Sequence, residues 1–348
     1  MADTTNPAAP AASASPSAAS PAPTGAAPDE ATIAADPRLD EGVDFDEDNE
    51  FVDSDRGVNG AYLHGRTFRN LAGTEYWGPS DDIQLEGADV NHHMLYLALE
   101  DKLCLAPIEN PQTVLDVGTG TGIWAIDFAD EYPSADVVGV DLAPNQPSWV
   151  PPNCRFEIDD LSKTWTFRDE TFDYIHIRWM MGSIEDWVKV YKECYRCLKP
   201  GGWVEHMDCS IVVRSNNNTF PEDSIWGDWF TAFTECAERT GRTLRICDDD
   251  TFAEWMKEAG FPDVQTRHVK VPIGDWPAEK RMKDVGRFNK LAAELGLEGY
   301  VLYLMTTVLG WGYADVQVWL AKVRSGLKQR NQQPYNTWGV AWAQKPLA

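Results

Sequence analysis

The middle of the chain alternates between two hydrophobic periods. Short β-rich or apolar runs are followed by stretches in which apolar residues recur every three or four positions, as on one face of a helix. Strands are expected at residues 113–117, 136–140, 154–158, 172–177 and 203–209, and helices at residues 91–104, 123–131 and 184–198. Strands that alternate with helices through short loops predict a parallel sheet with helices on both faces.

The last third of the chain has a different pattern. Helices are expected at residues 224–240 and 251–259, a strand at 264–271, helical segments within 279–328 and a last strand at 337–343. Helices that follow such a sheet commonly cover its ligand crevice. We therefore predict a helical cap formed by residues 220–260 and 278–328.

The first 55 residues show neither period. They are rich in Ala, Pro and Ser, then crowded with acidic residues, and such a segment buries too little apolar surface to offset its ordering entropy. We predict a disordered tail over residues 1–55 ahead of one domain over residues 56–348. The tail is either a regulatory segment for protein partners or a solubilising extension.

A glycine loop carries the clearest functional signal. Gly118, Gly120 and Gly122 join an expected buried strand to an expected helix, where a ligand can approach the backbone and the positive helix N-terminus. A dinucleotide-binding loop has the spacing G-x-G-x-x-G, but Ile123 occupies the position of its third glycine. Asp116, just before the loop, would repel a pyrophosphate and suits the ammonium and sulfonium groups of S-adenosylmethionine. The pattern favours S-adenosyl-L-methionine over NAD.

Two later strand ends support this interpretation. Asp141 ends the next strand and is placed for the two ribose hydroxyls, with Leu142 beside it. After the third strand, Asp160 is expected to accept from the adenine amino group while the Leu161 N–H donates to a ring nitrogen. A helix, a tight turn and a fifth strand follow at residues 198–205, in the order that this fold requires.

Charge, hydropathy and cysteine spacing indicate which partners, compartments and metals to expect. The net charge of −25 argues against direct nucleic-acid binding, because that binding depends on Lys and Arg. No apolar run approaches the roughly 18 residues of a membrane span, and no signal peptide begins the chain. We expect a cytoplasmic protein, with the nucleus as the alternative. Cys194 and Cys197 form a C-x-x-C without a second pair, so we interpret them as packing residues and predict no metal.

The chain resembles the LaeA-type methyltransferase family of filamentous fungi, in detail over residues 65–209 and loosely to the C-terminus. The resemblance rests on Asn91-His92-His93, Arg178 and residues 115–127, 139–147, 156–160, 172–176, 182–187 and 198–202. It implies a class I methyltransferase with a Rossmann-like, seven-stranded, mostly parallel sheet, and an activity in secondary metabolism as a tailoring enzyme or a regulator. Phe68 and Arg69 replace the usual Tyr and His, so no role of those two side chains carries over.

The acceptor site is the least defined part. His206, near the end of the fifth expected strand, is our candidate general base, although a lone His is more often structural. Arg178 binds either the methionine carboxylate or an acceptor carboxylate, or only packs, and His93 is a further cofactor-binding candidate. We expect a small-molecule acceptor methylated on O or N. The alternative is a regulator of secondary-metabolism genes that acts through protein partners, the acidic tail included.

Overall fold

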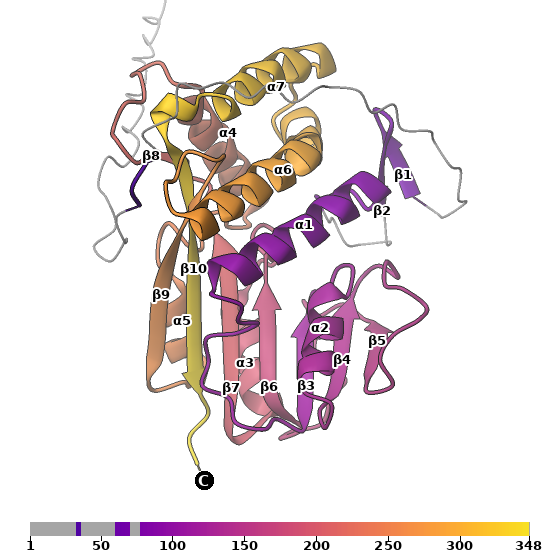
Figure 1. Ribbon diagram of the computed structural model, residues 1–348. Helices are drawn as coiled ribbons and strands as arrows, with labels where there is room; N and C mark the ends of the chain where they lie inside the picture. The colour runs from indigo at the N-terminus through magenta and orange to yellow at the C-terminus, as the bar shows by residue number, and fades with distance from the viewer. Residues whose placement is uncertain (1–32, 36–59, 70–76, 348) are drawn as a thin grey trace, which may run out of the picture.

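One mixed sheet organises the molecule. The computed structural model describes residues 33–35, 60–69 and 77–347. The sheet order is β5-β4-β3-β6-β7-β10, with β9 on the other side of β10 (Figure 1). The strands are β3 (Thr113–Val117), β4 (Asp136–Asp141), β5 (Cys154–Ile158), β6 (Phe172–Arg178), β7 (Leu198–Cys209), β9 (Val264–Pro272) and β10 (Pro334–Gln344), and the two-residue β8 (Arg214–Ser215) adds to β10.

The sheet is mostly parallel, as predicted. Strands β5, β4, β3, β6 and β7 run parallel, and only β10 is antiparallel to its neighbours β7 and β9. Parallel pairing brings the carboxyl ends of β3, β4 and β6 to the same edge. The expected seven-stranded, class I methyltransferase fold is confirmed, with β8 as a small addition.

Helices cover both faces of the sheet. On one face, α2 (Ile123–Glu131) packs Trp124 and Phe128 against Tyr174 of β6. On the other, α3 (Trp187–Cys197) and α5 (Phe252–Glu258) belong to the larger core cluster, which includes Ile177 of β6. Burial on both faces explains the buried Val and Leu residues of β3 and β4.

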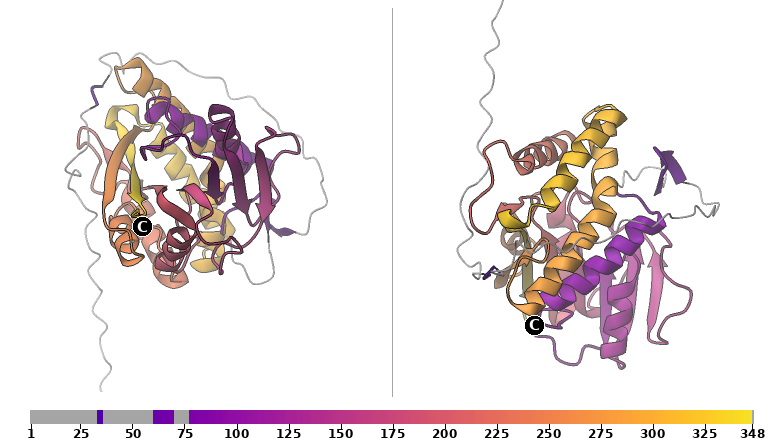
Figure 2. Two further views of the ribbon diagram at one scale, coloured as in Figure 1. Left: turned by 90° about the horizontal axis from the view of Figure 1, so that it is seen from below. Right: turned by 45° about the horizontal axis from the view of Figure 1, so that its top comes forward.

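A helical cap crosses the carboxyl edge of the sheet. It contains α4 (Ile225–Thr240), α6 (Lys280–Tyr303), a π-helical turn (Leu304–Val308) and α7 (Tyr313–Leu327), and a short 3₁₀ turn (Arg330–Gln332) leads into β10. The first helix, α1 (Asp82–Ala98), lies beside α6 in both views (Figures 1 and 2). The cap therefore includes α1 as well as α4, α6 and α7, whereas α5, within the expected cap segment 220–260, packs on the sheet face beside α3. None of the helices in the described ranges is long and apolar enough to cross a membrane.

Two helix boundaries were predicted wrongly. The helix expected at residues 91–104 begins at Asp82, because Asp81 caps it by accepting from the Gln84 N–H at 3.1 Å, and it ends at Ala98. The helical pattern over residues 279–328 is interrupted after the π-helical turn, where Gly310 has a φ of +77°. Both differences follow from capping and turn residues rather than from hydrophobic periodicity.

A hairpin ahead of α1 was not predicted. Its strands β1 (Gly60–Leu63) and β2 (Arg66–Arg69) pair antiparallel. Arg66 donates from Nε and Nη2 to the Asp81 carboxylate at 2.5 and 2.8 Å, and this pair joins the hairpin to the start of α1. Phe68, which replaces the family's usual Tyr, is buried beside Tyr303.

One short part of the N-terminal region packs on the domain. The tail predicted over residues 1–55 lies outside the described residues except for residues 33–35. There the Ile33 side chain is buried with Trp276 and Tyr335, and Ala35 forms a β-bridge with Pro277. The sequence pattern did not predict this contact, because a single apolar residue has no periodicity.

A buried carboxylate links the loop after α1 to the sheet. Glu205 of β7 is fully buried, and its Oε2 accepts from the backbone N–H groups of Leu105 and Ala106 at 2.8 and 2.6 Å. Burial raises its pKa to about 7, although these two hydrogen bonds act in the opposite direction. Folding therefore favours the protonated form of this side chain.

The first prediction concerns Ile33. Replacing Ile33 with Asp removes its burial against Trp276, so the free energy of unfolding should fall by about 1.5–3 kcal/mol. Ala34→Asp is the matched control, because that neighbouring side chain is exposed. Chemical denaturation of both variants measures the difference, and equal stabilities would show that residues 33–35 do not dock.

The second prediction concerns pH. Between pH 4.5 and about 7 the folded state holds a proton on Glu205 that the unfolded state has lost, so this group's stabilisation falls as pH rises. Glu205→Gln mimics the protonated form, so its advantage over the wild type should grow by about 2–3 kcal/mol from pH 5 to pH 8. Glu157→Gln, at a side chain 43% exposed, is the control. If the difference in free energy of unfolding between the Glu205 variant and the wild type is the same at pH 5 and pH 8, the prediction is wrong.

Candidate functional site

The glycine loop forms the centre of a cavity at the carboxyl edge of the sheet. Residues 118–122 connect β3 to α2, and the N–H groups of Gly118 and Thr119 donate to the Val140 carbonyl of β4 at 2.9 and 3.0 Å. Gly120 has a φ of +59°, and a Cβ built on it would meet no atom within 4 Å. The loop thus holds its backbone open to the cavity.

Asp141 fixes the next part of the wall. Its Oδ2 accepts from the Gly120 N–H at 2.9 Å and its Oδ1 from the Ala143 N–H at 3.0 Å. Burial raises the pKa of this carboxyl, while the hydrogen bonds from Gly120 and Ala143 lower it. Each oxygen keeps a further lone pair for a ligand hydroxyl. Leu142, predicted with Asp141, also lines the cavity.

Asp116 is the most enclosed carboxylate of the site. Its Oδ1 lies 2.8 Å from His176 Nδ1, and its Oδ2 accepts from the Thr119 hydroxyl at 2.6 Å. Burial lowers the pKa of His176 to about 4, so the imidazole is neutral near pH 7 and its Nδ1–H donates to Asp116. The His176 ring also stacks on Trp124 at 3.7 Å. Asp116 is therefore held in one orientation, at the edge of the cavity.

Arg178 is the cation of the cavity wall and sits at the end of β6. It donates from Nη1 to His92 Nδ1 at 3.0 Å, and His92 Nε2 lies 2.9 Å from Asp127. Since arginine only donates, Nδ1 of His92 accepts and its Nε2–H donates to Asp127. Burial lowers the pKa of His92, which agrees with a neutral ring in this chain of contacts. The sequence did not predict this relay.

After β5, the acidic residue that lines the cavity is one position earlier than the sequence predicted. Asp159 and Leu161 line the cavity, whereas Asp160 does not. The Asp160 carboxylate instead accepts from the N–H and hydroxyl of Ser162 at 3.0 and 2.6 Å. Since the loop turns at this point, Asp159 and Asp160 point in different directions, and sequence position alone does not distinguish them.

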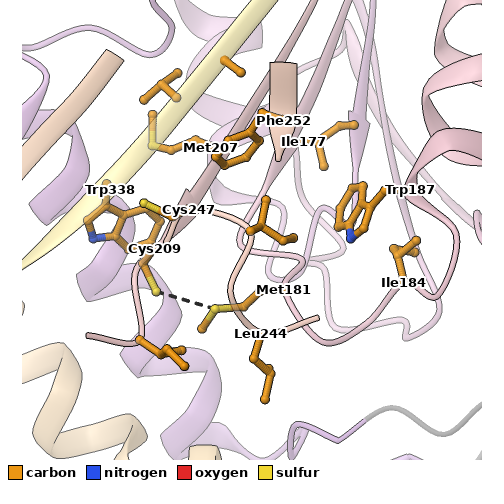
Figure 3. Packing of buried hydrophobic residues seen from close by; sticks show 14 of the residues in the cluster. Ile177, Met181, Ile184, Trp187, Met207, Cys209, Leu244, Cys247, Phe252 and Trp338 are labelled. Atoms are coloured by element: carbon orange, nitrogen blue, oxygen red, sulfur yellow. Dashed lines mark hydrogen bonds between the residues drawn. The ribbon is translucent and has the colours of Figure 1, made fainter. Parts of the chain in front are cut away.

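Two predicted histidines lie away from the cavity. His206 is fully buried on the face of the sheet covered by α3 and α5, where it bonds Tyr191 at 2.6 Å and stacks on Trp187 at 4.5 Å. Figure 3 shows the apolar side chains, Trp187 and Phe252 among them, that fill this region. His93 is exposed on α1 and contacts Phe288. Neither geometry supports the role predicted from the sequence.

The cavity has an acidic wall. With a volume of about 190 Å³, it is lined by the carboxylates Asp116, Asp141 and Asp159 together with Arg178. Carboxylates at these strand ends suit a ligand with positive charge and hydroxyl groups. Within the described ranges, no group of three or more His, Cys, Asp or Glu side chains is arranged to hold a metal ion. Cys194 and Cys197, the C-x-x-C pair, are both buried in the core.

A second, apolar cavity adjoins the first under the cap. Its volume is about 110 Å³, and its walls come mainly from α6, α4 and the loop after β7, with further residues from α7 and β10. Trp77, Asn91, Trp179 and Tyr300 line both cavities. Tyr300 lies in the cap segment expected at 278–328, but the sequence did not indicate that these four residues meet. They come from four separate segments of the chain, so only the tertiary fold brings them together.

Comparison with known proteins agrees with this geometry. Residues 90–266 match the methyltransferase domain family. The chain is 37% identical to Methyltransferase pytC of Aspergillus terreus, over 82% of this chain and 88% of that protein. It is 34% identical to Secondary metabolism regulator LAE1 of Cochliobolus heterostrophus, over 83% and 94%, and 29% identical to Protein-methionine methyltransferase laeA of Emericella nidulans, over 82% and 76%.

The sheet order, the glycine loop and the family match define a class I, S-adenosylmethionine-dependent methyltransferase. Its acidic cavity, with an open glycine backbone and three carboxylates, fits that cofactor. Within this class, the chain belongs to the LaeA-like family of fungal methyltransferases.

The third prediction tests the Asp141 contact. Asp141→Ala should weaken binding of S-adenosylhomocysteine by about 1.5–3 kcal/mol, the range for hydrogen bonds to a charged group. Asp136→Ala, at the other end of β4 in an exposed ion pair with Arg155, is the matched control. Isothermal titration calorimetry measures both affinities, and the wild type should not bind NAD. Unchanged affinity of the folded Asp141 variant would show that this carboxylate does not contact the cofactor.

Proposed function

We propose that this protein methylates oxygen or nitrogen on a small molecule in fungal secondary metabolism. The observation that carries the proposal is the pair of adjoining cavities, one acidic and one apolar. An acidic cavity suits the cofactor, and an apolar cavity beside it suits a small organic acceptor. The name of the relative pytC, a methyltransferase, agrees with this choice.

Each predicted cofactor residue in the cavity has a proposed role. Asp141 accepts from the ribose hydroxyls, and Asp116 faces the methionine ammonium group. Arg178 binds the methionine carboxylate, which is the anionic end of the cofactor. Asp159 takes the adenine contact that the sequence assigned to Asp160, while Leu161 packs against the base and donates from its N–H. Gly118 and Gly120 let the cofactor approach the loop, whereas Gly122, predicted with them, does not line the cavity, and a Cβ on it would overlap the Phe156 ring.

Alignment of donor and acceptor is the main contribution of the protein. The bound cofactor supplies a methyl group already activated on a sulfonium. Methyl transfer breaks the carbon–sulfur bond as a bond to the acceptor oxygen or nitrogen forms, so donor and acceptor must be collinear. No histidine is found among the described residues that line the two cavities. We propose that the acceptor proton leaves to water rather than to a histidine such as His206.

A second candidate function is regulation. The relative LAE1 is named a secondary metabolism regulator, and it is 34% identical to this chain. A regulator would use the same fold to act through protein partners, with the acidic N-terminal tail as one contact. Under either function we propose a cytoplasmic or nuclear protein that does not bind nucleic acid directly, given the net charge of −25.

The fourth prediction separates the two functions. In the producing fungus, Gly120→Arg places a long side chain in the cofactor cavity and should convert one or a few metabolites to their desmethyl forms. Gly241→Arg is the matched control, because Gly241 has a similar φ of +67° and an equally open Cβ position but lies at the end of α4. Mass spectrometry and RNA sequencing are run on both strains.

The result that would contradict the tailoring function is equally specific. If the protein is a regulator, the Gly120→Arg strain should lose transcripts of several unrelated pathways, and no desmethyl compound should accumulate. The tailoring function predicts unchanged transcripts and mass losses of one methylene group per compound. The Gly241→Arg strain should match the wild type in both measurements.

A further inference from the structure

The apolar cavity has walls that select for ring systems. Its aromatic lining comprises Trp77, Trp179, Trp226, Trp229, Phe233, Tyr300 and Trp338. Aromatic rings bind other rings edge-to-face or offset-stacked, which adds about 0.5–1.5 kcal/mol per pair beyond area burial. Trp229 is itself fixed by stacking on Trp319 at 5.6 Å and on Phe233 at 4.5 Å. The wall is therefore preformed rather than adaptable.

The charge of the cavity is as informative as its shape. Among the described residues that line it, none is charged, and the polar side chains include Asn91, Ser210, Asn289 and Asn336. Asn289 donates to Asn336 at 3.1 Å and to the Pro272 carbonyl at 2.8 Å. An ionised acceptor would lose its hydration here without gaining a counter-ion, which is costly. The occupant must be neutral.

Hydrogen-bond donors remain available at the wall. The Asn91 amide lines both cavities, and its side chain has no hydrogen-bond partner among the described residues. A buried donor without a partner costs roughly 1–3 kcal/mol, so a ligand oxygen that satisfies one would bind more tightly. This amide favours an occupant that carries an oxygen acceptor.

The volume suits a single ring. A cavity of about 150 Å³ lined by aliphatic and aromatic side chains holds one benzene molecule. The present cavity, at about 110 Å³, is somewhat smaller, so it takes one ring or its substituted edge with little room to spare. The remainder of a larger acceptor would extend past the residues that line both cavities, toward the first.

Two of the residues that line both cavities, Trp179 and Tyr300, are held in place by strained backbone and close packing. Trp179 has a φ of +55°, which is unfavourable for a bulky residue, and its N–H donates to the Met207 carbonyl at 2.9 Å. Its ring contacts those of Tyr300 and Trp338 edge-on, at 5.7 and 6.1 Å. A Cβ on Gly296 would overlap the Tyr300 ring, so glycine at this position lets that ring lie against α6.

We infer that the apolar cavity binds a neutral, oxygen-bearing aromatic ring of the acceptor, which Trp179 and Tyr300 orient toward the cofactor cavity. The inference rests on the proposed function and narrows its substrate class. A protein methionine, the acceptor named for the relative laeA of Emericella nidulans, is the competing occupant. A thioether also makes favourable sulfur–aromatic contacts, but it is only a weak hydrogen-bond acceptor, so the unpaired donors favour an oxygen-bearing ring.

Calorimetry on the full-length protein saturated with S-adenosylhomocysteine tests the inference with three probes. They are 4-methylphenol, the charged 4-methylbenzoate and N-acetylmethionine methylamide. The expected order has 4-methylphenol binding about tenfold or more tightly than the other two. Binding of 4-methylbenzoate or of the methionine amide at equal or higher affinity would overturn the inference. Failure of S-adenosylhomocysteine itself to bind would overturn the proposed function instead.

Cavity-filling variants locate the probe. Ala293→Phe on α6 and Val213→Phe in the loop after β7 both add bulk at the cavity wall. Each should weaken 4-methylphenol binding by about tenfold and leave the affinity for S-adenosylhomocysteine within about twofold. Leu291→Phe, on the exposed face of α6, is the matched control and should change neither. If both filling variants fold, as thermal melting shows, and bind the probe normally, the ring does not occupy this cavity.

Discussion

The buried carboxylate of Asp116 is the constraint on which the site depends. A carboxylate with 2% exposure must be hydrogen-bonded, because leaving it unpaired in the interior is costly. Its partners are His176 on the neighbouring strand β6 and Thr119 in the glycine loop. These two contacts join β3, β6 and the loop at one point, so the loop geometry and the sheet edge are set together.

The cap adds a second environment to this edge. Parallel strands bring acidic side chains and Arg178 to the cofactor cavity, while α4, α6 and β10 enclose an aromatic cavity beside it. The close approach of α1 and α6, which lie side by side in Figure 2, brings Asn91 and Tyr300 to the junction. The acidic cavity suits a charged methyl donor and the apolar cavity suits a neutral acceptor. The two cavities thus adjoin where methyl transfer is proposed to occur.

Patterns within short stretches of the sequence predicted the strands and the cofactor loop. The buried strands, the glycine loop and Asp141 follow from hydrophobic runs and from the strand–loop–helix order. His206 shows where such patterns fail. Side chains alternate along β7, so Glu205 and His206 face opposite sides of the sheet, and the His206 side is covered by α3 and α5. Position at a strand end did not specify the face.

The junction residues could not be predicted for a different reason. Trp77 and Tyr300 lie more than 200 positions apart in the sequence, and no local period relates them. His93 lies outside the site because the helix turns roughly 100° per residue, which directs it away from the buried side of Asn91. Long-range packing decided both cases.

A crystal structure of the protein with S-adenosylhomocysteine tests the central claim most directly. The account predicts the ribose hydroxyls within hydrogen-bonding distance of Asp141, and the ligand sulfur facing the junction between Trp179 and Tyr300. A ligand bound with its sulfur toward bulk solvent, or without contact to Asp141, would contradict the account.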